Sequence, residues 1–237
     1  MKKLSIFILL EISIFCLCHA YSEGSKTMIY KTDIYSIEYD KKSEPIVKTI
    51  NDALSQNFQR VMDFWGIKKL DSTVQIRIFS DLEEWKSFFK SLSQGTYQEY
   101  VTGCAIGSNI YVLDYAEYKK LQSHKNDSIE DFKKIIVHEF VHICHLQLCN
   151  LENTAFFMSE GLAAYLAGQG YNKNIKIDYP KEVLFSNEIF SRTNDLYSLS
   201  QKIVRKLEEK VPHEKLIEYA LDSKKLYDDW DSLALSN

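Results

Sequence analysis

The amino-acid sequence predicts an α+β fold, with a small sheet in the N-terminal half and mostly helices in the C-terminal half. Apolar and polar residues alternate as in strands only before residue 125, whereas helical spacing runs from Ser128 almost to the C-terminus. The 237 residues, 45% of them hydrophobic, are enough for one domain or two packed lobes. We expect lobes at 21–125 and 126–237, divided near the polar stretch Ser123 to Asp127.

The first 20 residues have the order of a secretory signal peptide. Lys2 and Lys3 precede an apolar run from Leu4 to Leu17, and small residues favour cleavage after Ala20. The run is short for a membrane span, so we expect a secreted protein with no stable membrane association after leader cleavage. The charge of Glu11 weakens the leader and leaves an uncleaved membrane anchor as the alternative.

The N-terminal lobe is expected to form a small antiparallel or mixed sheet. Three segments alternate as strands or hairpins do, namely Met28 to Tyr39, Thr73 to Phe79, and Tyr100 to Leu113 with a turn at Gly107-Ser108-Asn109. Two segments have helical features, namely Pro45 to Gly66 and a short helix capped by Ser80-Asp81 that runs through Phe89.

The C-terminal lobe is expected to be helical from its first residues. Ser128 and Asp131 have the spacing of a capping box at the start of a helix. A loop from Gly168 to Pro180 separates the central helices from two later ones, Asp195 to Lys210 and His213 to Leu221.

Charge and cysteine content exclude several classes of protein. The net charge is −4 with both signs interleaved, so there is no electrostatic footprint for nucleic acid. The three cysteines beyond the leader, Cys104, Cys144 and Cys149, cannot form a complete disulfide framework and lack the CxxC spacing of a structural zinc site. We expect Cys144 and Cys149 to pack as small hydrophobic residues. The pattern does not indicate an oligomeric state.

The stretch from Ile135 to His142 carries the strongest chemical signal. Residues four apart share one face of a helix, so His138 and His142 can converge on a single ion. Glu139 is rotated by about 100° from His138 and is placed to contact a water molecule beside the metal. Because the neighbouring residues are apolar on nearly all sides, three polar residues here need a functional reason.

A second stretch, Phe156 to Tyr165, offers a third metal ligand. Glu160 opens an apolar helix eighteen residues beyond His142, which leaves room for the first helix to end and the chain to return. Small residues follow it, which lets the two helices approach closely: Gly161, Ala163, Ala164 and Ala167. A catalytic zinc site needs three protein ligands and an open fourth position.

The segments HEFVH and FMSEGLAAYLAG resemble the glutamate zincins, in particular the peptidase-MA-like metallohydrolases. The resemblance implies a zincin-like fold, with the sheet lobe over an active-site helix and a helical lobe beyond it. It also implies that His138, His142 and Glu160 bind Zn²⁺ and that Glu139 is the general base. Leu196 to Ser200 resembles a similarly placed Tyr-x-x-Ser helix, which makes Tyr197 the first candidate for stabilising the oxyanion.

Other candidate residues are weaker. His145 lies two turns along the helix from His138, about 10 Å in axial rise, and we interpret it as a supporting or buried histidine rather than a ligand. The three-histidine zincin pattern is absent, since His145 and Leu148 stand where it needs Gly and His. Three other tyrosines are weaker candidates for the oxyanion donor: Tyr165, Tyr171 and Tyr179.

These features together predict a secreted zinc metallopeptidase that hydrolyses peptide bonds in peptide or protein substrates. The substrate is expected to add a strand along the Tyr100 to Leu113 hairpin, where Gly103 and Gly107 allow close approach or serve turn geometry. Two alternatives stay open, a zinc hydrolase of a non-peptide amide or ester and a non-catalytic zinc-stabilised binding protein.

Overall fold

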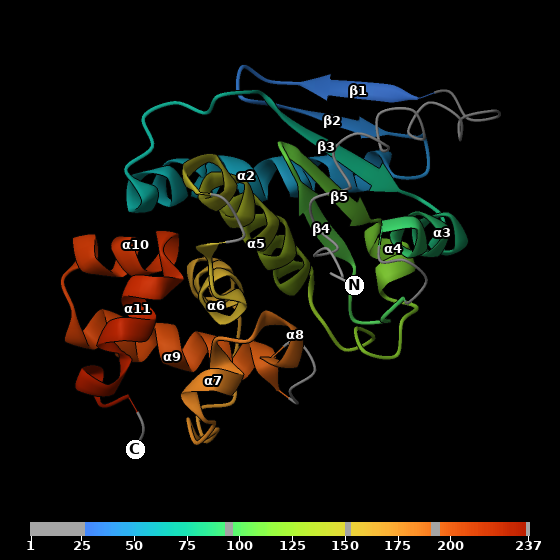
Figure 1. Cartoon of the computed structure of the whole chain (residues 1–237). Coiled ribbons are helices and arrows are strands. Elements are labelled where there is room, and N and C mark those ends of the chain that lie inside the picture. Colours follow the sequence, from blue (N-terminus) through green and yellow to red (C-terminus); the bar gives the residue numbers. More distant parts are fainter. Residues whose placement is uncertain (1–26, 93–96, 150–152, 191–194, 236–237) are drawn as a thin grey trace, which may run out of the picture.

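The computed structural model describes residues 27–92, 97–149, 153–190 and 195–235. Over these residues the chain forms a mixed sheet with flanking helices, packed against a second group of helices (Figure 1). The α+β class expected from the sequence is therefore confirmed. The expected signal peptide, residues 1–20, lies outside the described residues.

The described strands form one five-stranded sheet in the order β1-β2-β3-β5-β4. Their bounds are Met28–Lys31 (β1), Tyr35–Tyr39 (β2), Val74–Phe79 (β3), Gly103–Ile106 (β4) and Asn109–Leu113 (β5). The outer pairs β1–β2 and β4–β5 are antiparallel, whereas β2–β3 and β3–β5 are parallel. The sheet is thus mixed, and β4 is one of its two edges.

Parallel neighbours need crossover connections, and helices supply them. Helix α2 (Glu44–Trp65) connects β2 to β3, and α3 (Leu82–Leu92) follows β3. Gly66 ends α2 in the left-handed region, at φ 68°, which a glycine adopts without strain. Asp81 accepts hydrogen bonds from two backbone N–H groups in the first turn of α3. The expected helix boundaries are confirmed to within a few residues.

The sheet lobe meets the helical lobe through α5 (Ile129–Leu148), which follows the short α4 (Tyr115–Tyr118). Ser128 and Asp131 make both hydrogen bonds of the expected capping box. Helix α2 packs on α5, where the rings of Phe58 and Phe140 stack at 4.8 Å. His138 and His142 therefore lie on a helix whose first residue is set by the capping box and whose middle is buried between the sheet lobe and the helical lobe.

The helical lobe is built around the packing of α6 on α9. Its helices are α6 (Phe156–Leu166), α7 (Lys181–Leu184), α8 (Asn187–Phe190), α9 (Leu196–Lys210), α10 (His213–Leu221), α11 (Ser223–Asp229) and the 3₁₀ helix η2 (Trp230–Leu233). In Figure 1, α6 lies between α5 and α9. The loop expected between Gly168 and Pro180 contains no helix or strand.

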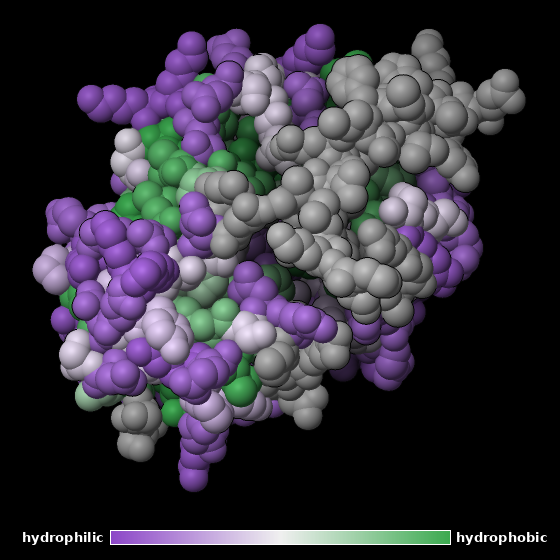
Figure 2. Space-filling view, viewed as in Figure 1, coloured by the Kyte–Doolittle hydropathy of each residue, from purple (hydrophilic) through white to green (hydrophobic). Residues whose placement is uncertain are grey.

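Hydrophilic side chains cover most of the helical lobe in the face shown in Figure 2, as the interleaved charges predict. Among the described residues, no helix is both long enough and apolar enough to span a bilayer. The thiols of Cys104, Cys144 and Cys149 are all free, and Cys144 is fully buried, as expected for a small core residue.

Candidate metal centre

Helix α5 places two histidines and a glutamate in its buried middle. His138 and His142 point their Nε2 atoms at each other across one turn, 3.1 Å apart. Helix α6 brings Glu160 to the same point, with its carboxylate oxygens 3.3 Å from His138 Nε2 and 3.5 Å from His142 Nε2. These three residues form the one such potential metal-binding group among the described parts of the chain.

The separations within this cluster match those around a four-coordinate metal. Ligand bonds of about 2.0–2.1 Å in a tetrahedral site put neighbouring donor atoms roughly 3.3 Å apart. The three donor-to-donor distances observed here, 3.1, 3.3 and 3.5 Å, bracket that value. The two distances from Glu160 end on different carboxylate oxygens, and the three residues lie close enough together that they could hold a metal ion.

The outer nitrogen atoms of both imidazoles have partners of their own. His138 Nδ1 lies 3.1 Å from the side-chain oxygen of Gln169, and His142 Nδ1 lies 3.2 Å from the hydroxyl of Ser159. Such contacts fix the ring orientation and leave Nε2 free to bind an ion. Neither Gln169 nor Ser159 was predicted from the sequence, although Ser159 directly precedes Glu160.

Two helices approach unusually closely behind Glu160. A Cβ atom added at Gly161 would lie 2.5 Å from the backbone oxygen of Ser200 and 2.7 Å from Val204 Cγ2 on α9. Only glycine fits at that separation. The small residue after Glu160 therefore sets the distance between α6 and α9, whereas the sequence had suggested an approach between α6 and α5.

Burial and mutual contact determine the charges in the cluster. Burial lowers the pKa of His142 to about 4, so this imidazole is neutral at pH 7. Burial opposes the charging of His138 and Glu160 too, but each stabilises the other, which raises the pKa of His138 and lowers that of Glu160. A bound cation would replace the proton that this pair shares.

Glu139 faces β4, the edge strand. A Cβ atom at Gly103 would lie 3.2 Å from Glu139 Oε1, and the nearby backbone of Ala105 favours the charged form of the carboxyl group. Burial raises the pKa of Glu139 to about 7, with His138 opposing the shift and Glu160 adding to it. A carboxyl group with this pKa can accept and return a proton near neutral pH.

Tyr197, at the start of α9, lies next to His138. Its ring centroid lies 6.4 Å from that of His138, and its side chain is 40% exposed. Tyr100, from the other lobe, meets it edge-on at 6.3 Å. The structure therefore places Tyr197 beside His138, and it pairs Tyr197 with a residue that the sequence did not single out.

The weaker tyrosine candidates are engaged elsewhere. Tyr165 donates a hydrogen bond to Glu208, and the rings of Tyr165 and Tyr171 both lie under the guanidinium group of Arg205. Tyr179 packs at the margin of the hydrophobic core.

His145 is a buried structural residue, as expected. Its ring stacks on Trp65 at 4.7 Å, and its Nε2 bonds to the carbonyl of Ala220 at 3.0 Å. Burial lowers its pKa to about 4. The neutral ring joins α2, α5 and α10.

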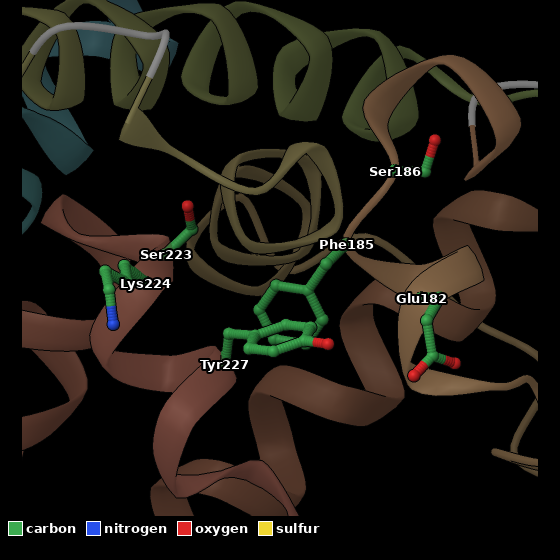
Figure 3. A pocket seen from close by; sticks show the side chains of 6 residues that line it. All are labelled: Glu182, Phe185, Ser186, Ser223, Lys224 and Tyr227. Atoms are coloured by element: carbon green, nitrogen blue, oxygen red, sulfur yellow. The ribbon is translucent and has the colours of Figure 1, made fainter.

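A surface hollow on the helical lobe lies away from this cluster. It is lined by Glu182, Phe185, Ser186, Ser223, Lys224 and Tyr227, from α7, α11 and the turns next to them (Figure 3). The rings of Phe185 and Tyr227 meet edge-on at 5.1 Å and form its apolar part. No metal-binding group includes these residues.

Comparisons with known proteins add no identification. No protein-family model matches the chain, and no curated protein sequence matches it. The functional interpretation therefore depends on the geometry of the site.

Proposed function

We propose that this chain is a zinc-dependent metallopeptidase with a zincin-like fold, exported from the cell by its N-terminal leader. One observation carries the proposal. His138, His142 and Glu160 form a group that could hold a metal ion, and Glu139, next to His138 on the same helix, faces the edge strand β4 at Gly103. The resemblance of the two motifs to the glutamate zincins supports the same conclusion.

Zinc fits this donor set better than other common ions. Two imidazole nitrogens and one carboxylate are the ligands of many catalytic zinc sites, whereas calcium and magnesium prefer oxygen ligands alone. The chemistry that bound zinc supplies is that of a Lewis acid, which polarises a carbonyl group and lowers the pKa of a water molecule.

Glu139 performs the proton transfers in this proposal. Its carboxylate accepts a proton from the attacking water and then donates it to the nitrogen of the leaving amine. Its packing against Gly103 of β4 holds the carboxyl group in place between these steps. Tyr197 donates a hydrogen bond to the oxygen that becomes negative in the tetrahedral intermediate.

The edge of β4 supplies a binding surface for an extended peptide. Ile106 and Asn109 flank a two-residue turn, so they form a hydrogen-bonded pair. By alternation, the peptide groups of Gly103 and Ala105 point away from β5, toward the free edge beside Glu139. A substrate strand added there would lie next to the base. This edge favours a peptide over a small amide or ester.

The decisive experiment is digestion of a mixed peptide library by the leaderless protein, with products identified by mass spectrometry. We expect cleavage by the zinc-loaded wild type and none by the Glu139→Gln variant, which should still bind one zinc ion because Glu139 is not a ligand. Equal cleavage by the two proteins would refute the role of Glu139. No cleavage by a zinc-loaded wild type would refute a general peptidase and favour a binding role.

A further inference from the structure

The side chain of Gln169 occupies the position next to a metal ligand where a charged partner is often found. Its Oε1 lies 3.1 Å from Nδ1 of His138, whose Nε2 faces the cluster, so Nδ1 carries the hydrogen that Gln169 accepts. We propose that Gln169 orients His138 for metal binding and that its neutral amide holds the metal affinity below the level that a carboxylate would give. This inference rests on the proposed metal centre.

The end of α6 aims Gln169 at His138. Gly168, at φ 67°, reverses the chain directly after the helix, and its N–H bonds to the carbonyl of Tyr165. The N–H of Gln169 bonds to the carbonyl of Ala164. These two bonds are those of a Schellman motif, which places the residue after the glycine back against the last turns of the helix. The side chain of Gln169 therefore starts from a fixed point at the end of α6.

Helix α9 fixes the same residue from the other side. The side-chain amide of Gln201, which is fully buried, donates a hydrogen bond of 3.0 Å to the backbone carbonyl of Gln169. Arg205, one turn further along α9, donates to Gln201 in turn at 3.4 Å. Both backbone groups of Gln169 are thus bonded, and its side chain is free to act on His138 alone.

The charge of the partner decides how strongly an imidazole holds a cation. A carboxylate that accepts the Nδ1 hydrogen makes the ring a better donor and adds negative charge beside the ion, whereas a neutral amide only orients the ring. His142 has a neutral partner as well, the hydroxyl of Ser159. Glu160 is then the one carboxylate in the cluster.

Two substitutions of Gln169 separate orientation from charge. Gln169→Met keeps the length of the side chain but removes the acceptor, and we expect the affinity for zinc to fall by about 10- to 100-fold. Gln169→Glu keeps the acceptor and adds the charge, and we expect the affinity to rise at least about threefold. Zinc and cobalt affinities would be measured at pH 7.5 by competition with a chromophoric chelator, with the cobalt absorption spectrum as a second readout of ligand geometry.

Gln147→Met is the matched control. Gln147 lies on α5 beyond His142. Its side-chain oxygen accepts a hydrogen bond from the backbone N–H of Asp71, and its side-chain nitrogen donates one to the carbonyl of Lys69. We expect its substitution to leave metal affinity unchanged. The proposal would be overturned if both Gln169 variants bound zinc within twofold of the wild type. It would also be overturned if both lost the same amount of zinc affinity, because that result indicates a purely structural role. Failure of the wild type to bind metal would instead refute the metal centre itself, and a missing peptidase activity would leave the affinities unaffected.

Discussion

Replacing Gly161 by alanine tests whether the contact between α6 and α9 determines the geometry of the metal centre. The added Cβ would lie 2.5 Å from the Ser200 carbonyl oxygen, whereas ordinary contacts begin near 3.4 Å, so the helices must separate by about 0.9 Å. The Ser200 oxygen belongs to the backbone of α9, so it cannot move aside by a side-chain rotation. Overpacking of this kind costs about 1–3 kcal/mol, which exceeds the gain of about 1 kcal/mol in helix propensity.

We therefore expect Gly161→Ala to lower the free energy of unfolding by up to about 2 kcal/mol, and the melting temperature by up to roughly 8 °C for a protein of this size. Because Glu160 moves with α6, zinc affinity should fall as well. Urea unfolding in the presence of a chelator measures the first effect, and calorimetric titration with zinc measures the second.

Gly170→Ala is the control for this experiment. A Cβ atom at Gly170 meets nothing within 4 Å, and its φ is not in the left-handed region, so the same substitution should change stability and zinc affinity little. If Gly161→Ala were as stable as the wild type and bound zinc equally well, the close approach of α6 and α9 would have no role in forming the site.

Three further predictions follow from the geometry of the site. If the hydroxyl of Tyr197 stabilises the oxyanion, Tyr197→Phe should lower kcat by about 10²–10³-fold and leave zinc affinity unchanged. Steady-state kinetics would check this, with Tyr165→Phe as a control that should have little effect. Gly103→Ala should reduce peptide cleavage, because its Cβ would lie 2.8 Å from Ile135 Cγ2 and 3.2 Å from Glu139 Oε1; unchanged cleavage would contradict the contact. The metal-free protein should lose stability as the pH falls from about 6.5 to about 4. Over this range His145 takes up a proton in the unfolded chain but not in the folded protein, and its contribution to the loss is at most about 3 kcal/mol. His145→Gln should show a smaller loss in urea unfolding at pH 7 and pH 5.

Local patterns in the sequence predicted what depends on local geometry. The spacing of His138 and His142 fixes their common face on any helix, and the capping box at Ser128 fixes where that helix begins. The two hairpins and α2 followed from periodicity and turn residues in the same way. Glu160 was a candidate from its place at the start of an apolar helix eighteen residues beyond His142, and the resemblance to the glutamate zincins supported it. Tyr197 came from that resemblance alone.

The features that were missed depend on tertiary structure. Alternation in Thr73 to Phe79 predicts a strand but not its neighbours, so the parallel pairing of β3 with β2 and β5 was not foreseen. Gln169 was missed because its role depends on the turn at Gly168 and on the distance between α6 and α5. A glycine followed by a polar residue after AAYLA was the one available signal, and it predicts a helix end without showing where the next side chain points.

Helix α9 holds the proposed metal centre together although it contributes none of the three residues of the cluster. Its backbone at Ser200 sets the position of α6, and hence of Glu160, through the contact at Gly161. Gln201, one residue further, holds the carbonyl of Gln169, and Tyr197, one turn earlier, faces His138. A shift of α9 would therefore alter a metal ligand, the partner of a second ligand and the proposed oxyanion donor together. Substitutions in α9 far from the ion should for this reason change metal affinity and turnover in parallel, whereas substitutions in β4 should change turnover alone.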